Sequence, residues 1–382
     1  MISRCDITPS KDSLPPDGKT PDLPEGVPPL LSLQLYLSIG CNLKCRHCWV
    51  NSRHVTGMPD PKDLIDMELL RSAVAEAKTL GLFRAVLTGG EPMVHPHFRE
   101  ITEMLSSEGL SLCLVTNGTL INDRIAQWLK DSTRVSSICL SLDGSDAQIH
   151  DQFRGVPGAF DATLSGLDLL ADAGHRNLQV ICCVHRGNAH QADDLVALAR
   201  DHGATSVKFT PLTNKGRGSE LHSRQEGLSL EECIALEKHL RTELSDIEVF
   251  FSLFPPALLP LKELWRKGGI IGNCGVLTNL GILGTGEISL CGIGRTVPEM
   301  VFGRLGDSIR EIWLNQSGLK ELRRELLDVA NYPGICRDCI HASTCMTGCV
   351  ANNFVEGSRL VWPSFFCTEA EAKGLFPAKR RR

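Results

Sequence analysis

The sequence predicts an α/β fold in which six parallel strands form a curved or partial barrel, followed by a smaller cysteine-rich domain. Three observations support this prediction. Short apolar runs alternate with helical patterns between residues 31 and 211, and this alternation stops after residue 220. The chain also has 382 residues, which is too long for one average domain.

Six segments have the composition of buried strands. Each is rich in Val, Ile, Leu or Thr and has Gly, Asn, Asp or Pro at or close to its end. Together they cover residues 31–39, 84–89, 110–117, 135–143, 177–185 and 205–212. The patterns of the segments between them predict helices. In residues 63–81, for example, Leu69, Ala73 and Ala77 are expected on one face, with Gly81 as the stop.

A repeated strand-helix unit requires parallel strands, because parallel neighbours need a crossover connection. The carboxyl ends of the strands then meet at one rim, where chemistry gathers in such folds. We predict four regions: a Pro-rich lead-in at 1–29, a core domain at 30–230, a connecting helical segment at 231–270 and a cysteine-rich domain at 271–382.

Composition excludes several classes of protein. A formal net charge of -5 without a basic stripe argues against nucleic-acid binding, and no apolar run approaches the roughly 20 residues that span a bilayer. We therefore expect a cytoplasmic protein whose sixteen cysteines are reduced. Five cysteines in apolar or periodic segments are expected to be core residues: Cys113, Cys139, Cys182, Cys183 and Cys233.

Three cysteines lie close together just after the first predicted strand. Cys41, Cys45 and Cys48 offer three ligands, whereas a structural zinc site needs four. An iron-sulfur cubane can leave its fourth iron to an outside ligand, so this spacing favours a cluster over zinc. Zinc stays open as the alternative, with His47 as its fourth ligand.

This motif, C-x3-C-x2-C with the His47 ring beside the third cysteine, resembles that of radical S-adenosylmethionine (SAM) enzymes. The resemblance implies a 4Fe-4S cluster whose open iron is chelated by the amino and carboxylate groups of SAM. It also implies a role in SAM binding for residues at successive strand ends. These are Gly89, Gly90 and Glu91 of a GGEP segment, Ser141, Arg154 and Leu212, and the resemblance implies cofactor binding for His47 as well.

The C-terminal cysteines resemble the seven-cysteine SPASM extension of the same family, which carries two auxiliary clusters. The resemblance implies one 4Fe-4S cluster on Cys336, Cys339, Cys345 and Cys367, and another on Cys274, Cys291 and Cys349. Structural zinc ribbons are the alternative. Some relatives have an eighth cysteine where this chain has Leu280, so the second cluster is open to an outside ligand in this interpretation.

The resemblance implies that a 5'-deoxyadenosyl radical abstracts hydrogen from a peptide or protein, most often a ribosomally made peptide that gains a thioether, a crosslink or an epimerised centre. Expected partners are an electron donor such as flavodoxin or ferredoxin and a separate leader-binding protein. A tetrapyrrole side-chain enzyme is the alternative, for which Lys208, Lys215 and Arg217 could meet propionates.

Two further classes are less favoured. Sulfatase-maturing relatives carry a catalytic aspartate where this chain has Gly292. A non-catalytic iron-sulfur protein would need the clusters without the SAM contacts.

Overall fold

The computed structural model describes residues 21–244, 247–266, 275–357 and 359–382. Its main sheet has ten strands in the order β12-β11-β10-β1-β4-β5-β6-β7-β8-β9. All neighbours from β10 through β9 are parallel, and only β10-β11 and β11-β12 are antiparallel. The predicted parallel α/β fold is confirmed.

The six predicted strands are all present. They are β1 Ser32–Ser38, β4 Arg84–Gly89, β5 Ser111–Thr116, β6 Val135–Ser141, β7 Leu178–Val184 and β8 Ser206–Pro211. A short two-stranded sheet, β2 Gly40–Cys41 and β3 Arg53–His54, follows β1 and carries the first motif cysteine. The carboxyl ends of the six strands therefore open onto one side of the molecule.

The sheet extends beyond the six strands at both edges. β9, Glu248–Phe251, adds beside β8 from within the segment predicted to be a helical connection. At the other edge, β10 Asn279–Ile282 pairs with β1 and leads to β11 Glu287–Ser289 and β12 Val301–Arg304. The cysteine-rich region thus shares a sheet with the core domain.

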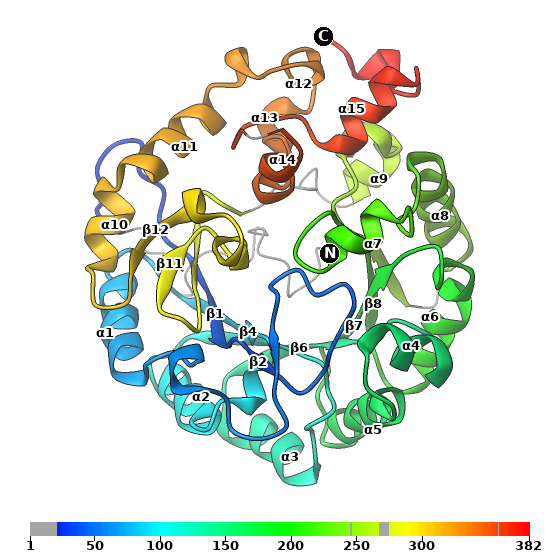
Figure 1. Ribbon diagram of the computed structural model, residues 1–382. Coiled ribbons are helices and arrows are strands. Elements are labelled where there is room, and N and C mark those ends of the chain that lie inside the picture. Colours follow the sequence, from blue (N-terminus) through cyan, green and yellow to red (C-terminus); the bar gives the residue numbers. More distant parts are fainter. Residues whose placement is uncertain (1–20, 245–246, 267–274, 358) are drawn as a thin grey trace.

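Helices cover the outside of the curved sheet (Figure 1). Those of the core domain are α1 Met67–Lys78, α2 Phe98–Ser107, α3 Asp123–Ser132, α4 Ala147–Arg154, α5 Ala159–Asp172, α6 Ala192–Asp201, α7 Gly218–Ser223 and α8 Leu230–Glu243. The ring continues with α9 Leu261–Arg266, α10 Ile309–Asn315, α11 Ser317–Leu327, α12 Ile335–Asp338 and α15 Phe365–Ala372, while α13 Ala342–Cys345 and α14 Val350–Gly357 lie nearer the middle of the view. In the described part of the chain, no helix has the length and apolar character that a membrane span requires.

Local signals explain where these helices begin. The Asp66 carboxylate accepts a hydrogen bond from the Leu69 amide at the start of α1, and Ser229 and Glu232 form a capping box at the start of α8. One prediction for α1 was wrong. Leu69 is 41% exposed, and Leu70 is the fully buried residue that packs with Ala73 and Ala77.

The main core lies between the sheet and its helices, where alternate strand residues such as Leu35, Leu87 and Leu140 are fully buried. Cys113 and Cys139 point to the opposite side of the sheet, where they pack with Val86. They are buried as predicted, but both are disulfide-bonded rather than reduced. Proximity on neighbouring strands, which composition does not reveal, accounts for the difference.

Candidate functional site

The three motif cysteines lie at the carboxyl rim, directly after β1. Cys41 and Cys45 are buried, and Cys48 is half-buried. Hydrogen-bond donors face each sulfur atom: the Leu43 amide lies 3.4 Å from Cys41 Sγ, an Arg154 guanidinium nitrogen 3.7 Å from Cys45 Sγ, and the Ser52 amide 3.4 Å from Cys48 Sγ. Donors placed this way stabilise thiolates and tune the potential of an iron-sulfur cluster.

The chemistry of these donors fits an iron-sulfur cluster. Burial raises the pKa of Cys41 to about 12 and also raises that of Cys45, so the metal-free protein holds both as thiols at neutral pH. Binding iron must therefore release protons. Across the described residue ranges, no three His, Cys, Asp or Glu side chains are arranged to hold a single metal ion.

The GGEP segment lies against the start of the cysteine loop. A Cβ at Gly89 would be 2.5 Å from the Ser38 carbonyl oxygen, and one at Gly90 would be 2.2 Å from that of Gly40. Only glycine fits at these two positions, because the turn after β4 presses against the backbone that leads into Cys41.

The Glu91 carboxylate joins the ends of two strands. It accepts hydrogen bonds from the Thr116 hydroxyl (2.8 Å), the Asn117 amide (2.8 Å) and the Met93 amide (3.2 Å). Burial raises its pKa to about 7, although these three donors oppose the shift. Glu91 therefore fixes the turn after β4 to the turn after β5.

A buried ion pair contacts the cysteine loop through Arg154. Arg154 Nε lies 2.6 Å from the Asp143 carboxylate, and the same arginine reaches Cys45. Burial alone would raise the pKa of Asp143, but the charges of Arg154 and His47 hold it below its usual value. Asp143 also accepts a hydrogen bond from the Cys183 amide at 2.7 Å. The sequence identified Asp143 only as a strand end.

His47 is the first ring of a three-ring stack. The centres of the His47 and Phe153 rings are 4.2 Å apart, and the angle between their planes is 8°. The centres of the Phe153 and His185 rings are also 4.2 Å apart, with an interplanar angle of 17°. Burial lowers the pKa of His47 to about 3, despite the opposing charge of Asp143 at 3.7 Å. Leu212 packs against Phe153, so this predicted SAM-binding residue lies beside the stack.

Ser141 ends β6 at the same rim and is half-buried. The structure therefore brings Gly89, Gly90, Glu91, Ser141, Arg154 and Leu212 to the rim that also carries the cysteine loop. Their contacts with SAM stay predictions.

The C-terminal cysteines fall into two groups. Burial raises the pKa of Cys367 well above its usual value, and the thiols of Cys345, Cys336 and Cys339 add to the shift. Burial likewise raises the pKa of Cys291 to about 11, with a contribution from Cys349. This grouping matches the two predicted ligand sets, which stay predictions because Cys274 lies outside the described residues.

Leu280 and Gly292, two positions near Cys291, are both tightly packed. Leu280 is fully buried in the main core, while a Cβ on its neighbour Gly281 would be 2.8 Å from Cys291 Cα, so residue 280 points away from Cys291. At Gly292, a Cβ would be 2.7 Å from the rings of both Trp49 and Tyr36. Aromatic rings therefore occupy the space that a side chain at position 292 would need.

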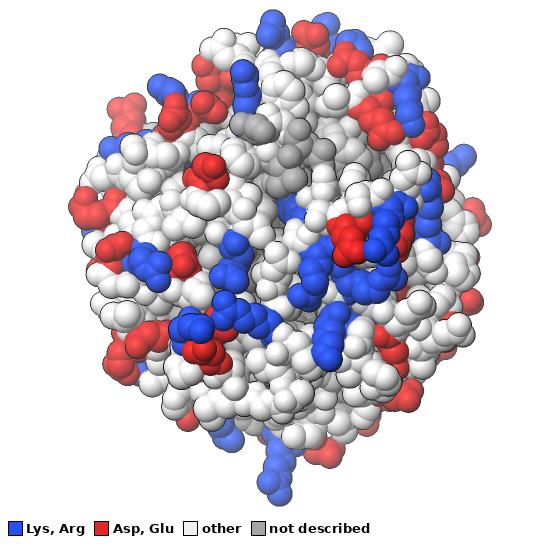
Figure 2. Space-filling view, viewed as in Figure 1, with Lys and Arg blue, Asp and Glu red and all other residues white. Residues whose placement is uncertain are grey.

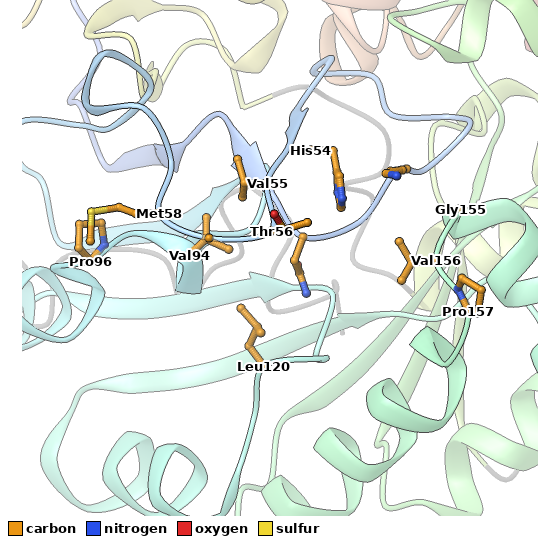
Figure 3. A pocket seen from close by; sticks show the side chains of 13 residues that line it. His54, Val55, Thr56, Met58, Val94, Pro96, Leu120, Gly155, Val156 and Pro157 are labelled. Atoms are coloured by element: carbon orange, nitrogen blue, oxygen red, sulfur yellow. The ribbon is translucent and has the colours of Figure 1, made fainter.

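A pocket of about 670 Å³ lies beside the cysteine loop (Figure 3). Asn42 and Lys44, which flank Cys41 and Cys45 in sequence, line it together with residues 54–58, the turn after β4 and residues 155–157. Most of the labelled side chains are apolar, and Lys44 is exposed. The pocket gives solvent access to the region next to the first two cysteines.

The pKa of His47 predicts acid sensitivity. Because the folded-state pKa of about 3 lies below the usual 6.5, this ring stabilises the metal-free protein above pH 6.5, and the stabilisation is lost as the pH falls toward 3. Lowering the pH from 7 to 5 should cost about 2 kcal/mol through His47 alone. We expect His47→Phe, which keeps the stack, to reduce this loss in urea unfolding; an unchanged pH dependence would contradict the assignment.

Comparisons with known proteins agree with this geometry. The model of the radical SAM superfamily matches residues 35–199. The AdoMet-dependent heme synthase of Methanosarcina barkeri is 28% identical, covering 83% of this chain and 90% of the relative. The mycofactocin maturase MftC of Mycobacterium ulcerans is 29% identical, covering 87% and 86%.

Solved structures share the fold. The crystal structure of Streptococcus suis SuiB bound to S-adenosylmethionine has a TM-score of 0.69 at 16% sequence identity, covering 90% of this chain and 77% of SuiB. SuiB bound to its precursor peptide SuiA has a TM-score of 0.68 at 15% identity, covering 90% and 76%. With the superfamily match over residues 35–199 and the cysteine loop after β1, these findings show that the chain contains a radical SAM domain, and they support an iron-sulfur enzyme.

Proposed function

We propose that this enzyme matures a peptide or protein by abstracting hydrogen from it. The observation that carries this proposal is the gathering of the three motif thiols, two of them buried, and the candidate SAM contacts at one rim of the barrel. When bound, the 4Fe-4S cluster and SAM supply the 5'-deoxyadenosyl radical. The protein's part is to hold the partners close together and keep water away. We propose that it acts in the cytoplasm, with a separate protein to bind any leader peptide.

The choice of a peptide rests on the maturase relative and on the likeness to an enzyme seen with a precursor peptide. The heme synthase relative favours a tetrapyrrole as the second candidate. Of the basic residues considered for propionate binding, Arg217 is already engaged, because its guanidinium donates to the carbonyl oxygens of Cys45 (2.8 Å) and Ser52 (2.9 Å). The crowding at Gly292 weakens the case for a sulfatase maturase.

Mass spectrometry of the source cell tests the choice of substrate. Small cysteine-containing peptides should change mass when the enzyme is present, and should stay unchanged with the variant in which Cys41, Cys45 and Cys48 are all Ala. A mass change confined to tetrapyrroles would favour the second candidate. If neither class changes although 5'-deoxyadenosine forms, the peptide proposal fails and the radical chemistry stands.

We further propose that the two C-terminal cysteine groups hold auxiliary 4Fe-4S clusters, one on Cys336, Cys339, Cys345 and Cys367, and one on Cys274, Cys291 and Cys349. The electrostatic coupling within each described group supports this. Because Leu280 points into the core, a substrate thiolate could bind the second cluster without competition from that position.

Iron and acid-labile sulfide analysis tests the cluster number. After anaerobic reconstitution, we expect about twelve irons per chain, falling to about eight when Cys41, Cys45 and Cys48 are Ala, since each cubane holds four irons. Cys233→Ala, which removes a buried free cysteine outside both groups, is the matched control and should keep all the iron. About four irons in the wild type, with zinc at the C-terminal thiols, would refute the auxiliary clusters.

We propose that an electron donor of the flavodoxin or ferredoxin type docks over the pocket at Lys44. An exposed lysine between two cluster cysteines suits an acidic partner and a short electron path. Lys44→Glu should slow cluster reduction by flavodoxin at least about tenfold at low salt without slowing reduction by dithionite. The control Lys320→Glu, on α11, should slow neither; an equal effect of both variants would contradict this docking site.

A further inference from the structure

Lys215 is the only lysine with a buried side chain in the described part of the chain, with 8% of its surface exposed. It lies in the loop after β8, which packs directly on the cysteine loop. A Cβ at Gly216 would be 2.5 Å from the Cys48 carbonyl oxygen and 2.6 Å from that of Trp49. The Arg217 amide also donates to the Cys48 carbonyl at 3.0 Å. The backbone around Lys215 is therefore held firmly against the first cluster site.

The Lys215 ammonium faces aromatic rings. Its Nζ lies 5.9 Å from the centre of the Trp49 ring, and Trp49 meets Tyr36 edge to face at 6.3 Å. Both rings pack against Gly292, the residue after Cys291. Lys215, Trp49 and Tyr36 thus line the region between the cysteine loop and Cys291.

No Asp or Glu of the described ranges forms an ion pair with Lys215; its described charge interactions are with the Trp49 ring and with the Cys291 thiol, whose pKa it lowers. A buried cation is costly to maintain unless an anion or hydrogen-bond acceptor meets it. Figure 2 shows Lys and Arg side chains around the hollow at the centre of this face, while most Asp and Glu lie nearer the edge.

We propose that Lys215 anchors a carboxylate of the substrate, and that Trp49 and Tyr36 form an apolar wall for the group that carries it. This inference rests on the proposed function, because it assumes a peptide bound between the first cluster and Cys291. The carboxylate belongs either to the last residue of the peptide or to an acidic side chain. Lys215 would then act as a specificity residue that places the reacting residue near the radical.

Probe binding to the reconstituted, SAM-loaded enzyme tests this proposal. N-acetyl-phenylalanine and its amide differ only in the carboxylate, and N-acetyl-glutamic acid α-amide carries the acid on a side chain. Equilibrium dialysis should show at least about tenfold tighter binding of one of the two acids than of the neutral amide. Which acid is preferred distinguishes a chain end from a side chain. Equal binding of all three probes by the wild type would overturn the proposal without any variant.

Variants assign the preference to Lys215. Lys215→Met and Lys215→Gln should bind acid and amide equally, Lys215→Arg should keep much of the preference, and the exposed-site control Lys320→Met should behave as wild type. SAM affinity and substrate-free 5'-deoxyadenosine formation should stay unchanged in Lys215→Met, which separates this test from a failure of the radical chemistry.

Two results with Lys215→Met would overturn the proposal. Loss of SAM affinity would mean that Lys215 holds the carboxylate of SAM. A retained acid preference together with a lower reduction potential of an auxiliary cluster would mean that Lys215 is a counter-charge to the Cys291 site.

Discussion

The buried pair of Asp143 and Arg154 is the interaction on which the arrangement of the site depends. Asp143, two residues after β6, accepts a hydrogen bond from the β7 backbone and forms an ion pair with Arg154, and Arg154, the last residue of α4, reaches Cys45. The backbone follows the same path, since the amides of Lys44 and Arg46 donate to the carbonyl oxygens of Arg154 and Phe153. Removing one member of such a pair leaves an uncompensated buried charge, at a cost of about 3–5 kcal/mol. One ion pair therefore links two strands, one helix and the cysteine loop.

The second constraint is the single sheet that joins the core to the cysteine-rich region. β10 pairs with β1 in parallel, so the segment that leads to Cys291 begins beside the strand that leads to Cys41. Glycine at 281 and 292 lets Cys291 approach the sheet and lets the rings of Tyr36 and Trp49 pack beside it. The two cysteine regions thus face a shared space at the carboxyl rim, in which Lys215 lies.

Sequence periodicity predicted the six parallel strands and the rim that they share, because a strand-helix repeat permits few topologies. Periodicity did not predict β9 and β10. Both are short strands that form because they pair with an edge of the six-stranded sheet, β9 with β8 and β10 with β1. Periodicity placed Leu69 in the core because one residue's rotation on a helix separates Leu69 from Leu70. The roles of Asp143, His185 and Lys215 depend on contacts between distant loops. The Asp and the Arg of "SLDG" and "IHDQFRG" were the available signals for the ion pair.

The central claim is that the three cysteines after β1 support reductive cleavage of SAM. Formation of 5'-deoxyadenosine and methionine by the dithionite-reduced, reconstituted protein tests it most directly. The wild type should produce both, whereas the variant with Ala at 41, 45 and 48 should produce neither while it keeps the iron bound elsewhere. Absence of 5'-deoxyadenosine from the fully reconstituted wild type, or its undiminished formation by the triple variant, would contradict the account.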